Sequence, residues 1–207
     1  MYRVFFKRFI DIVCGLLGCM LFAVAFIFVA PAIYFTDKGP VFYNSDRRGK
    51  KGKTFKMYKF RSMYVNSPNL KNADGSTYNS DDDPRVTKIG KIMRKTSIDE
   101  LPQFINVLKG DMSMIGPRPT LALRPFSECD PETIKRYDVR PGITGYSQAY
   151  FRNSITQQEK FMHDCYYVDN LSFVMDMKII FKTAMSVLKR ENINTVTAEK
   201  EKVEIGK

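Results

Sequence analysis

The sequence predicts an α+β protein in which an N-terminal membrane helix precedes a small mixed cytosolic domain. Residues Ile12 to Phe35 form an uncharged run of 24 residues, which is long enough to reach across a bilayer. Two short aromatic-rich segments around a basic turn predict a β-hairpin, and amphipathic surface helices follow. We therefore expect a membrane-embedded segment 1–37, a cytosolic domain 38–190 and a polar tail 191–207.

The membrane segment has basic residues on both of its flanks. Lys7 and Arg8 precede it, and six cations follow it: Lys38, Arg47, Arg48, Lys50, Lys51 and Lys53. Because basic flanks stay in the cytoplasm, this symmetry favours a re-entrant helix, with Pro31 as one place where it can break. The alternative is a single transmembrane anchor. A cleaved signal peptide fits poorly, because the apolar run far exceeds a usual signal-peptide core.

The net charge of +11 requires an anionic partner, which could be nucleic acid, anionic membrane lipid or a phosphorylated substrate. No helix-turn-helix, zinc-ligand or RNA-binding pattern is found, so we expect no nucleic acid. The four cysteines form no CxxC pair, which suits a reducing compartment.

The first cytosolic segments predict a hairpin with strands at Val41–Ser45 and Thr54–Phe60. The basic turn between them resembles the end of a phosphate-binding P-loop. The resemblance fails, because the first glycine of that pattern would fall on Arg47.

The rest of the cytosolic domain alternates loops and helices. Residues 66–84 predict an exposed loop, in which Asp81–Asp83 either bind a cation or are simply solvated. Residues 86–96 form a basic amphipathic pattern that suits an anionic membrane surface, core packing, or both. Two further helices are expected near Gln157–Val168 and Phe173–Lys189.

The stretch from Lys95 to Pro119 carries the clearest chemical signal. Asp99 and Glu100 lie at the start of a short apolar helix, and a rigid Gly-Pro-Arg-Pro loop follows with Arg118. Two carboxylates and a cation this close together indicate phosphoryl chemistry. A structural alternative is a capping box formed by Ser97 and Glu100. His163 is the only histidine, so catalysis would rest on carboxylates, cations and a metal.

Eight motifs in one order resemble the small monotopic phosphoglycosyl transferases, also called bacterial sugar transferases. The resemblance runs from about Phe5 to Arg190. The matching segments are Lys59–Met63, Asp83–Thr87, Arg94–Gln103, Asn106–Ser113, Gly116–Pro119, Arg140–Gly145, Tyr166–Val168 and Asp176–Lys178.

The resemblance implies transfer of a sugar 1-phosphate from a UDP-sugar to undecaprenyl phosphate, with release of UMP. This reaction starts bacterial glycan assembly (capsule, O-antigen, exopolysaccharide or glycoprotein) at the cytoplasmic face of the inner membrane. The chain departs from the family twice. It has Ala23-Val24 where relatives commonly break the membrane helix with Ser-Pro, and Phe151 replaces a glycine in a substrate-facing loop.

The resemblance also implies roles for individual residues. Asp99 would be the nucleophile that forms an aspartyl phosphosugar and a ligand of Mg²⁺, kept ionised by a helix N-terminus. Glu100 would orient or deprotonate the lipid phosphate, or help to hold the metal. Asp176 would anchor a cation or metal, or form a salt bridge. The expected phosphate- and substrate-binding residues are Lys59, Arg94, Arg118, Gln148, Arg152 and Asp176.

Two other functions fit parts of the sequence. A membrane-tethered scaffold or lipid-binding protein explains the charge and the apolar segment, but not the Asp-Glu and Gly-Pro-Arg-Pro motifs. A metal-dependent glycosyltransferase would move the sugar alone and release UDP instead of UMP. The sequence leaves the sugar, the glycan pathway and the oligomeric state open.

Overall fold

The computed structural model describes residues 1–68, 70, 78, 80, 83–123, 125–152 and 154–188. The predicted tail 191–207, most of the loop within 66–84, and the carboxylates of Asp81 and Asp82 lie outside this set. The described part is a mixed helix and strand structure, as predicted.

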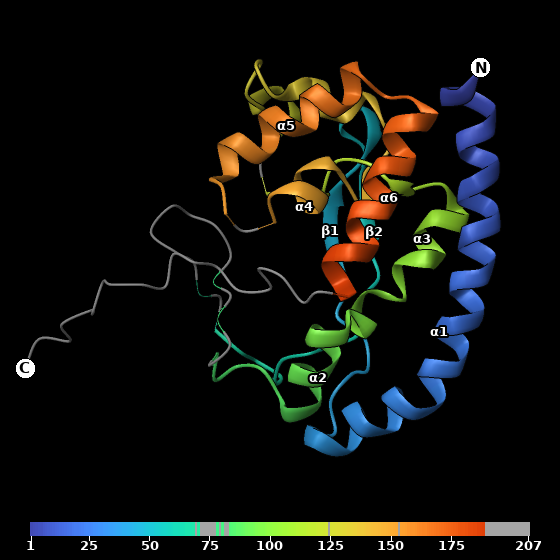
Figure 1. Ribbon diagram of the computed structural model, residues 1–207. Coiled ribbons are helices and arrows are strands. Elements are labelled where there is room, and N and C mark those ends of the chain that lie inside the picture. The colour runs from blue at the N-terminus through green and yellow to red at the C-terminus, as the bar shows by residue number, and fades with distance from the viewer. Residues whose placement is uncertain are drawn as a thin grey trace, which may run out of the picture.

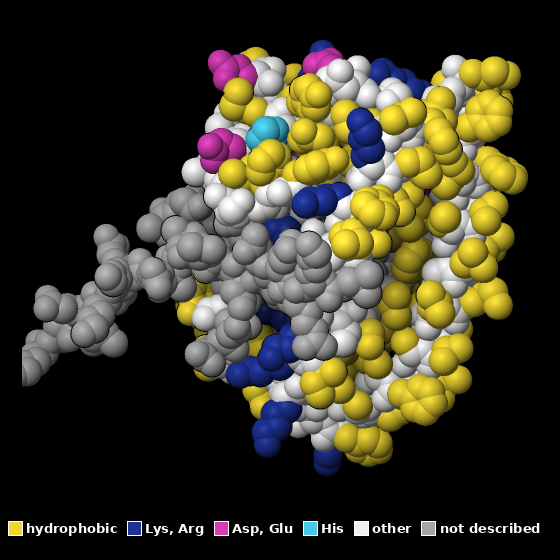
Figure 2. Space-filling view, in the orientation of Figure 1, with side chains coloured by type: hydrophobic (Ala, Val, Ile, Leu, Met, Phe, Trp, Pro, Cys, Tyr) yellow, Lys and Arg dark blue, Asp and Glu magenta, His cyan; other side chains and the backbone are white. Residues whose placement is uncertain are grey.

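A long apolar helix runs along one side of the molecule (Figure 1). A π-helical turn, η1 (Tyr2–Phe6), leads into α1 (Lys7–Asp37). By length and composition this helix could cross a membrane, and most of its apolar side chains are exposed. Figure 2 shows hydrophobic side chains covering this side of the molecule. Pro31 lies inside α1 without ending it, so the predicted break at this proline is wrong.

One face of α1 packs closely on α3 (Gln103–Lys109). Gly15 and Gly18 make this approach possible, because neither presents a side chain to α3. A Cβ atom on Gly18 would lie 2.1 Å from a ring carbon of Phe104. The small residues therefore set how closely α1 approaches α3.

Two small sheets form the strand layer of the domain. β1 (Ser45–Arg48) pairs antiparallel with β2 (Thr54–Met57) on one edge and with β4 (Thr120–Leu121) on the other. β3 (Ser113–Ile115) and β5 (Gly142–Thr144) form a separate parallel pair. The sequence analysis did not predict β3, β4 or β5.

The predicted hairpin is confirmed, but its first strand begins later and its second strand ends earlier than expected. We predicted strands at Val41–Ser45 and Thr54–Phe60, whereas β1 begins at Ser45 and β2 ends at Met57. Phe42 makes only an isolated bridge to Phe60. The Phe42 and Phe60 rings stack at 5.5 Å, and Phe22 of α1 lies 5.6 Å from Phe60.

The predicted helices are present. The basic amphipathic segment forms α2 (Lys88–Thr96), and Figure 2 shows Lys and Arg side chains around it. The later helices are α5 (Gln157–Asp169) and α6 (Phe173–Leu188). The short elements are η2 (Lys50–Gly52), η3 (Ile98–Glu100), η4 (Phe126–Glu128), η5 (Ile134–Asp138) and α4 (Tyr146–Tyr150).

The hydrophobic core is divided into three clusters, and one of them joins α1 to the domain. In that cluster Val29 and Ile33 of α1 pack with Phe60 and with Met93 of α2. A second cluster lies among β3, α4, α5 and α6. Its buried members are Ile115, Ala149, Tyr167, Val168, Leu171 and Ile179.

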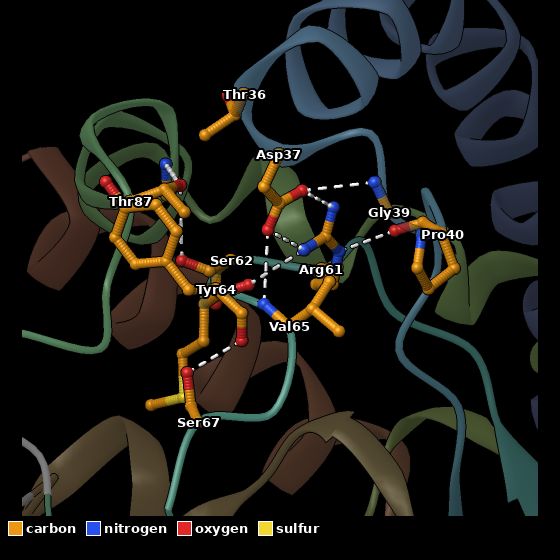
Figure 3. Close-up of polar contacts among 12 residues, drawn as sticks. Thr36, Asp37, Gly39, Pro40, Arg61, Ser62, Tyr64, Val65, Ser67 and Thr87 are labelled. Atoms are coloured by element: carbon orange, nitrogen blue, oxygen red, sulfur yellow. Dashed lines mark hydrogen bonds and ion pairs between the residues drawn. The ribbon is translucent and has the colours of Figure 1, made fainter.

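The C-terminal end of α1 is tied to the domain by an ion pair (Figure 3). The Arg61 guanidinium donates to both carboxylate oxygens of Asp37 at 2.5 Å. Its Nε donates to the Pro40 carbonyl, and the Val65 amide donates to Asp37 at 3.1 Å. Such a two-pronged pair fixes orientation as well as distance.

We predict that Arg61→Ala lowers the free energy of unfolding by about 3 kcal/mol, because it leaves the largely buried Asp37 carboxylate without its cation. Reversible unfolding in mixed detergent micelles measures this loss. The double variant Asp37→Ala/Arg61→Ala is expected to recover part of it. If the double variant loses as much free energy of unfolding as the two single variants lose in total, Asp37 and Arg61 are not coupled.

Candidate active site

Lys59 joins the two predicted catalytic carboxylates. Its Nζ lies 2.7 Å from Asp99 Oδ2 and 3.3 Å from Glu100 Oε1. Asp99 is only 2% exposed, whereas 23% of the Glu100 side chain is exposed. One carboxylate is therefore enclosed and its neighbour faces the solvent side of the site.

Backbone contacts hold these residues together. Lys59 follows β2, and the amide of the next residue, Phe60, donates to the Asp99 carbonyl at 3.0 Å. Ser97 has a left-handed backbone conformation (φ 58°) that ends α2 and begins η3. The chain thus turns sharply just before the two carboxylates.

Two expectations about this turn are wrong. Ser97 makes no side-chain cap, so the capping box with Glu100 is not formed. Asp99 also does not lie at the N-terminus of α3, because that helix begins at Gln103. The nearest positive charge to Asp99 is the Lys59 ammonium group and not a helix dipole.

The surroundings shift the pKa values of Asp99 and Glu100 differently. Burial raises the pKa of Asp99; the Lys59 charge opposes this, and the Glu100 charge adds to it. Burial also acts to raise the pKa of Glu100, but the charges of Lys59 and Arg118 outweigh it, and that pKa is lowered. The two pKa values are thus shifted in opposite directions.

Two arginines line the same site. Arg118 Nη2 lies 3.8 Å from Glu100 Oε1, and the side chain is 59% exposed. Arg47 of β1 acts electrostatically on both Glu100 and Arg118. A small pocket beside them is lined by Arg47, Met57, Gln103, Arg118, Pro119, Gly142 and Ile143. Arg47 was not predicted as a site residue, since only the pairing of β1 with β4 brings it next to the Arg118 loop.

Arg94, in the last turn of α2, lies near Asp99. Its Nε donates to Ser62 Oγ at 3.0 Å, and its charge acts to lower the pKa of Asp99. The structure therefore brings together four predicted site residues with Arg94 close by. These four are Lys59, Asp99, Glu100 and Arg118.

The loop that carries Arg118 is held through its carbonyl groups, since its two prolines have no N–H to donate. The Gly142 amide donates to the Pro117 carbonyl at 3.0 Å. Arg136 Nη2 donates to the Arg118 carbonyl at 2.8 Å, and Arg47 reaches the Pro119 carbonyl at 3.4 Å. Three successive carbonyls thus have donors from three different segments.

Arg136 and Asp164 form a buried ion pair behind this loop. Arg136 Nη2 lies 2.6 Å from Asp164 Oδ2, and both side chains are 2% exposed. Ser147 Oγ donates to the other carboxylate oxygen at 2.8 Å. The Arg136 guanidinium also stacks on Phe161, with its centre 4.0 Å from the ring centroid. Sequence reasoning missed this pair, because its members are 28 residues apart.

The other predicted site residues lie outside this group. Gln148 of α4 donates to the Ile143 carbonyl at 3.2 Å, next to the small pocket. Arg152 follows α4 with a left-handed backbone (φ 48°). Asp176 is fully buried and accepts hydrogen bonds from Tyr2, Lys7 and Tyr167 at 2.6 to 2.7 Å. The salt bridge expected as its alternative role is thus present, with Lys7.

Asp99 and Glu100 could bind a magnesium ion only together with water and substrate oxygens. Among the described residues, no group of three or more His, Cys, Asp and Glu side chains could hold a metal. Magnesium at phosphate sites commonly takes one or two carboxylates and completes its shell with water and substrate oxygens. Asp99 and Glu100 can supply that minimal set.

The chain matches the bacterial sugar transferase family over residues 2–190. It belongs to this family. The galactosyl transferase CpsE of Streptococcus agalactiae serotype III is 41% identical over 88% of this chain and 42% of its own length. The sugar transferase EpsL of Bacillus subtilis is 40% identical over 94% of both chains.

A third relative carries a more specific name. The UDP-N-acetylgalactosamine-undecaprenyl-phosphate N-acetylgalactosaminephosphotransferase of Aeromonas hydrophila is 41% identical over 89% of this chain and 44% of its own length. The chain therefore spans less than half the length of this relative and of CpsE, and nearly all of EpsL.

We predict that Asp164→Asn lowers the free energy of unfolding by about 3 kcal/mol, because it leaves a buried guanidinium without its counter-charge. Ser147→Ala removes only one hydrogen bond to the same carboxylate and should cost about 1 kcal/mol. Unfolding of both variants in mixed micelles provides the comparison. Equal losses of unfolding free energy would mean that the ion pair contributes no more to stability than the hydrogen bond from the Ser147 hydroxyl.

Proposed function

We propose that this protein transfers a sugar 1-phosphate from a UDP-sugar to undecaprenyl phosphate and releases UMP. The observation that carries the proposal is the enclosed Asp99 carboxylate, held by Lys59 beside the more exposed Glu100. Arg118 and Arg47 add positive charge next to this pair. The name of the Aeromonas relative describes the same class of donor and acceptor.

The reaction would take place in two displacements at one phosphorus atom. An Asp99 carboxylate oxygen attacks the phosphorus next to the sugar, and the bond from that phosphorus to the bridging oxygen breaks, so that UMP leaves with this oxygen. An oxygen of the lipid phosphate then attacks the same phosphorus and releases the Asp99 carboxylate. Glu100 would orient or deprotonate the lipid phosphate.

Positive charge is necessary because every participant is an anion. Two like unit charges 4 Å apart repel by about 4 kcal/mol at an effective dielectric constant of 20. Lys59 offsets the charge of the nucleophile, and arginine guanidinium groups match phosphate oxygens in geometry. Since the Arg118 loop is fixed through its carbonyls, its guanidinium needs little reorganisation.

Asp99, with Glu100, would hold the Mg²⁺ that we propose as cofactor. When bound, this ion would offset charge on the diphosphate of the donor. The protein residues still orient the nucleophile and bind the substrate phosphates.

We further propose that α1 is re-entrant and that the protein lies at the cytoplasmic face of the bacterial inner membrane. Arg8 near one end donates to the Val107 and Leu108 carbonyls at 2.7 and 2.8 Å, and Asp37 at the other end binds Arg61. The 31 residues of α1 would span about 46 Å if straight. Contacts from both ends to one domain support placing both ends on one side. The basic face of α2 would meet anionic lipid.

We predict that incubation with the correct UDP-sugar and Mg²⁺, without lipid acceptor, adds the mass of one sugar phosphate to the wild-type protein. Asp99→Asn should form no adduct, because a carboxamide is a poor nucleophile. Intact-protein mass spectrometry is the measurement, and Asp111→Asn is the matched control.

The nucleotide released when undecaprenyl phosphate is added distinguishes the alternatives. UMP without an adduct on Asp99 would indicate direct transfer, and UDP would indicate a glycosyltransferase. No nucleotide with any sugar tested would favour a scaffold or lipid-binding protein.

We predict that Lys59→Met moves the acidic limb of the pH–rate profile for adduct formation to higher pH. Asp99 must be ionised to attack, and the Lys59 charge lowers its pKa against the effect of burial. Removing that charge raises the pKa, so protonation inactivates the variant at a pH where the wild type still reacts. Lys91→Met on α2 is the control. An unshifted acidic limb would show that the Lys59 charge does not influence the ionisation of Asp99.

A further inference from the structure

A second cavity, of about 300 Å³, lies beside the start of α1. Residues of η1, α1, η2, β3, η5 and α5 line it, and none of the four residues of the candidate active site does. Its basic lining residues are Arg3, Lys7, Arg8, Lys50, Lys135 and Arg140.

The cavity has an excess of positive charge. Three carboxylates also line it (Asp11, Asp138 and Asp169), and Asp176 pairs with Lys7. Six cations and four carboxylates leave a net charge of +2. A site with this excess attracts an anion.

Three of the arginines donate to carbonyl groups, which do not cancel their charge. Arg8 binds the Val107 and Leu108 carbonyls, and Arg140 Nε binds the Gly110 carbonyl at 2.8 Å. Arg3 donates to the carbonyls at the end of α5, including Val168 at 3.1 Å. These contacts hold the guanidinium groups in place while their formal charges persist.

Exposed apolar side chains lie beside this charge. Val4 both lines the cavity and is exposed, and its neighbours Phe5, Phe6 and Phe9 are also exposed. A ligand that satisfies both features has an anionic head and an apolar chain. Free phosphate would satisfy the charge alone.

We propose that this cavity binds the phosphate headgroup of an anionic membrane phospholipid, whose acyl chains follow the exposed face of η1 and α1. The arginines and lysines would contact the phosphate oxygens. This site is separate from the one proposed for the acceptor at Asp99, and its test needs no UDP-sugar.

The test is titration of the full chain in neutral detergent with short-chain phosphatidylglycerol, followed by native mass spectrometry. We expect one lipid to bind per chain, and phosphatidylcholine and inorganic phosphate to bind at least roughly tenfold more weakly. Lys50→Glu/Lys135→Glu should weaken phosphatidylglycerol binding roughly tenfold, because it reverses the net charge of the cavity. Lys56→Glu/Lys182→Glu makes an equal change of charge at exposed residues of β2 and α6 that do not line the cavity, and it should alter binding less than about twofold.

Three results would overturn the proposal. Equal binding of phosphatidylcholine would remove the role of charge, and equal binding of inorganic phosphate would remove the role of the lipid chain. Equal weakening by Lys56→Glu/Lys182→Glu would show a general charge effect. If the double variant has a lowered thermal midpoint, Lys50→Gln/Lys135→Gln gives the same comparison without repulsion from Asp169. Adduct formation on Asp99 in the same preparations reports the proposed reaction independently.

Discussion

The segment Lys59–Ser62 connects the long apolar helix α1 to the candidate catalytic pair. Lys59 binds Asp99 and Glu100, while the Phe60 ring packs against α1. The next two residues continue the connection, because Arg61 binds the end of α1 and Ser62 accepts from Arg94. A displacement of α1 would therefore displace the cation that holds Asp99. The packing of α1 and the assembly of the candidate site depend on the same four residues.

Much of the positive charge of this protein is used inside the fold. Arg8, Arg136 and Arg140 all donate to backbone carbonyls. Guanidinium groups suit this use, since each has several donors and remains charged. The charge of +11 thus serves two purposes, as structural hydrogen bonding and as attraction for anions. The Arg118 loop illustrates the first, because its prolines leave only carbonyls for neighbouring segments to hold.

The two adjacent carboxylates have different environments, although their residue types are nearly equivalent. Asp99 is enclosed and Glu100 is partly exposed, so burial and neighbouring charges shift their pKa values in opposite directions. The enclosed group suits a nucleophile that must lose its water, and the exposed one suits contact with an incoming phosphate. Proximity in sequence alone would not distinguish these roles.

The sequence by itself determined the apolar N-terminal helix, the basic amphipathic α2, the hairpin and the helices α5 and α6, because each depends on a local pattern of residues. The motifs also indicated Asp99, Glu100, Lys59 and Arg118. Tertiary structure alone decided the course of α1, the parallel pairing of β3 with β5 and the Arg136–Asp164 ion pair. It also placed Asp176 with Lys7, away from Asp99. These features join residues far apart in the chain, so their energies arise only once the segments pack together.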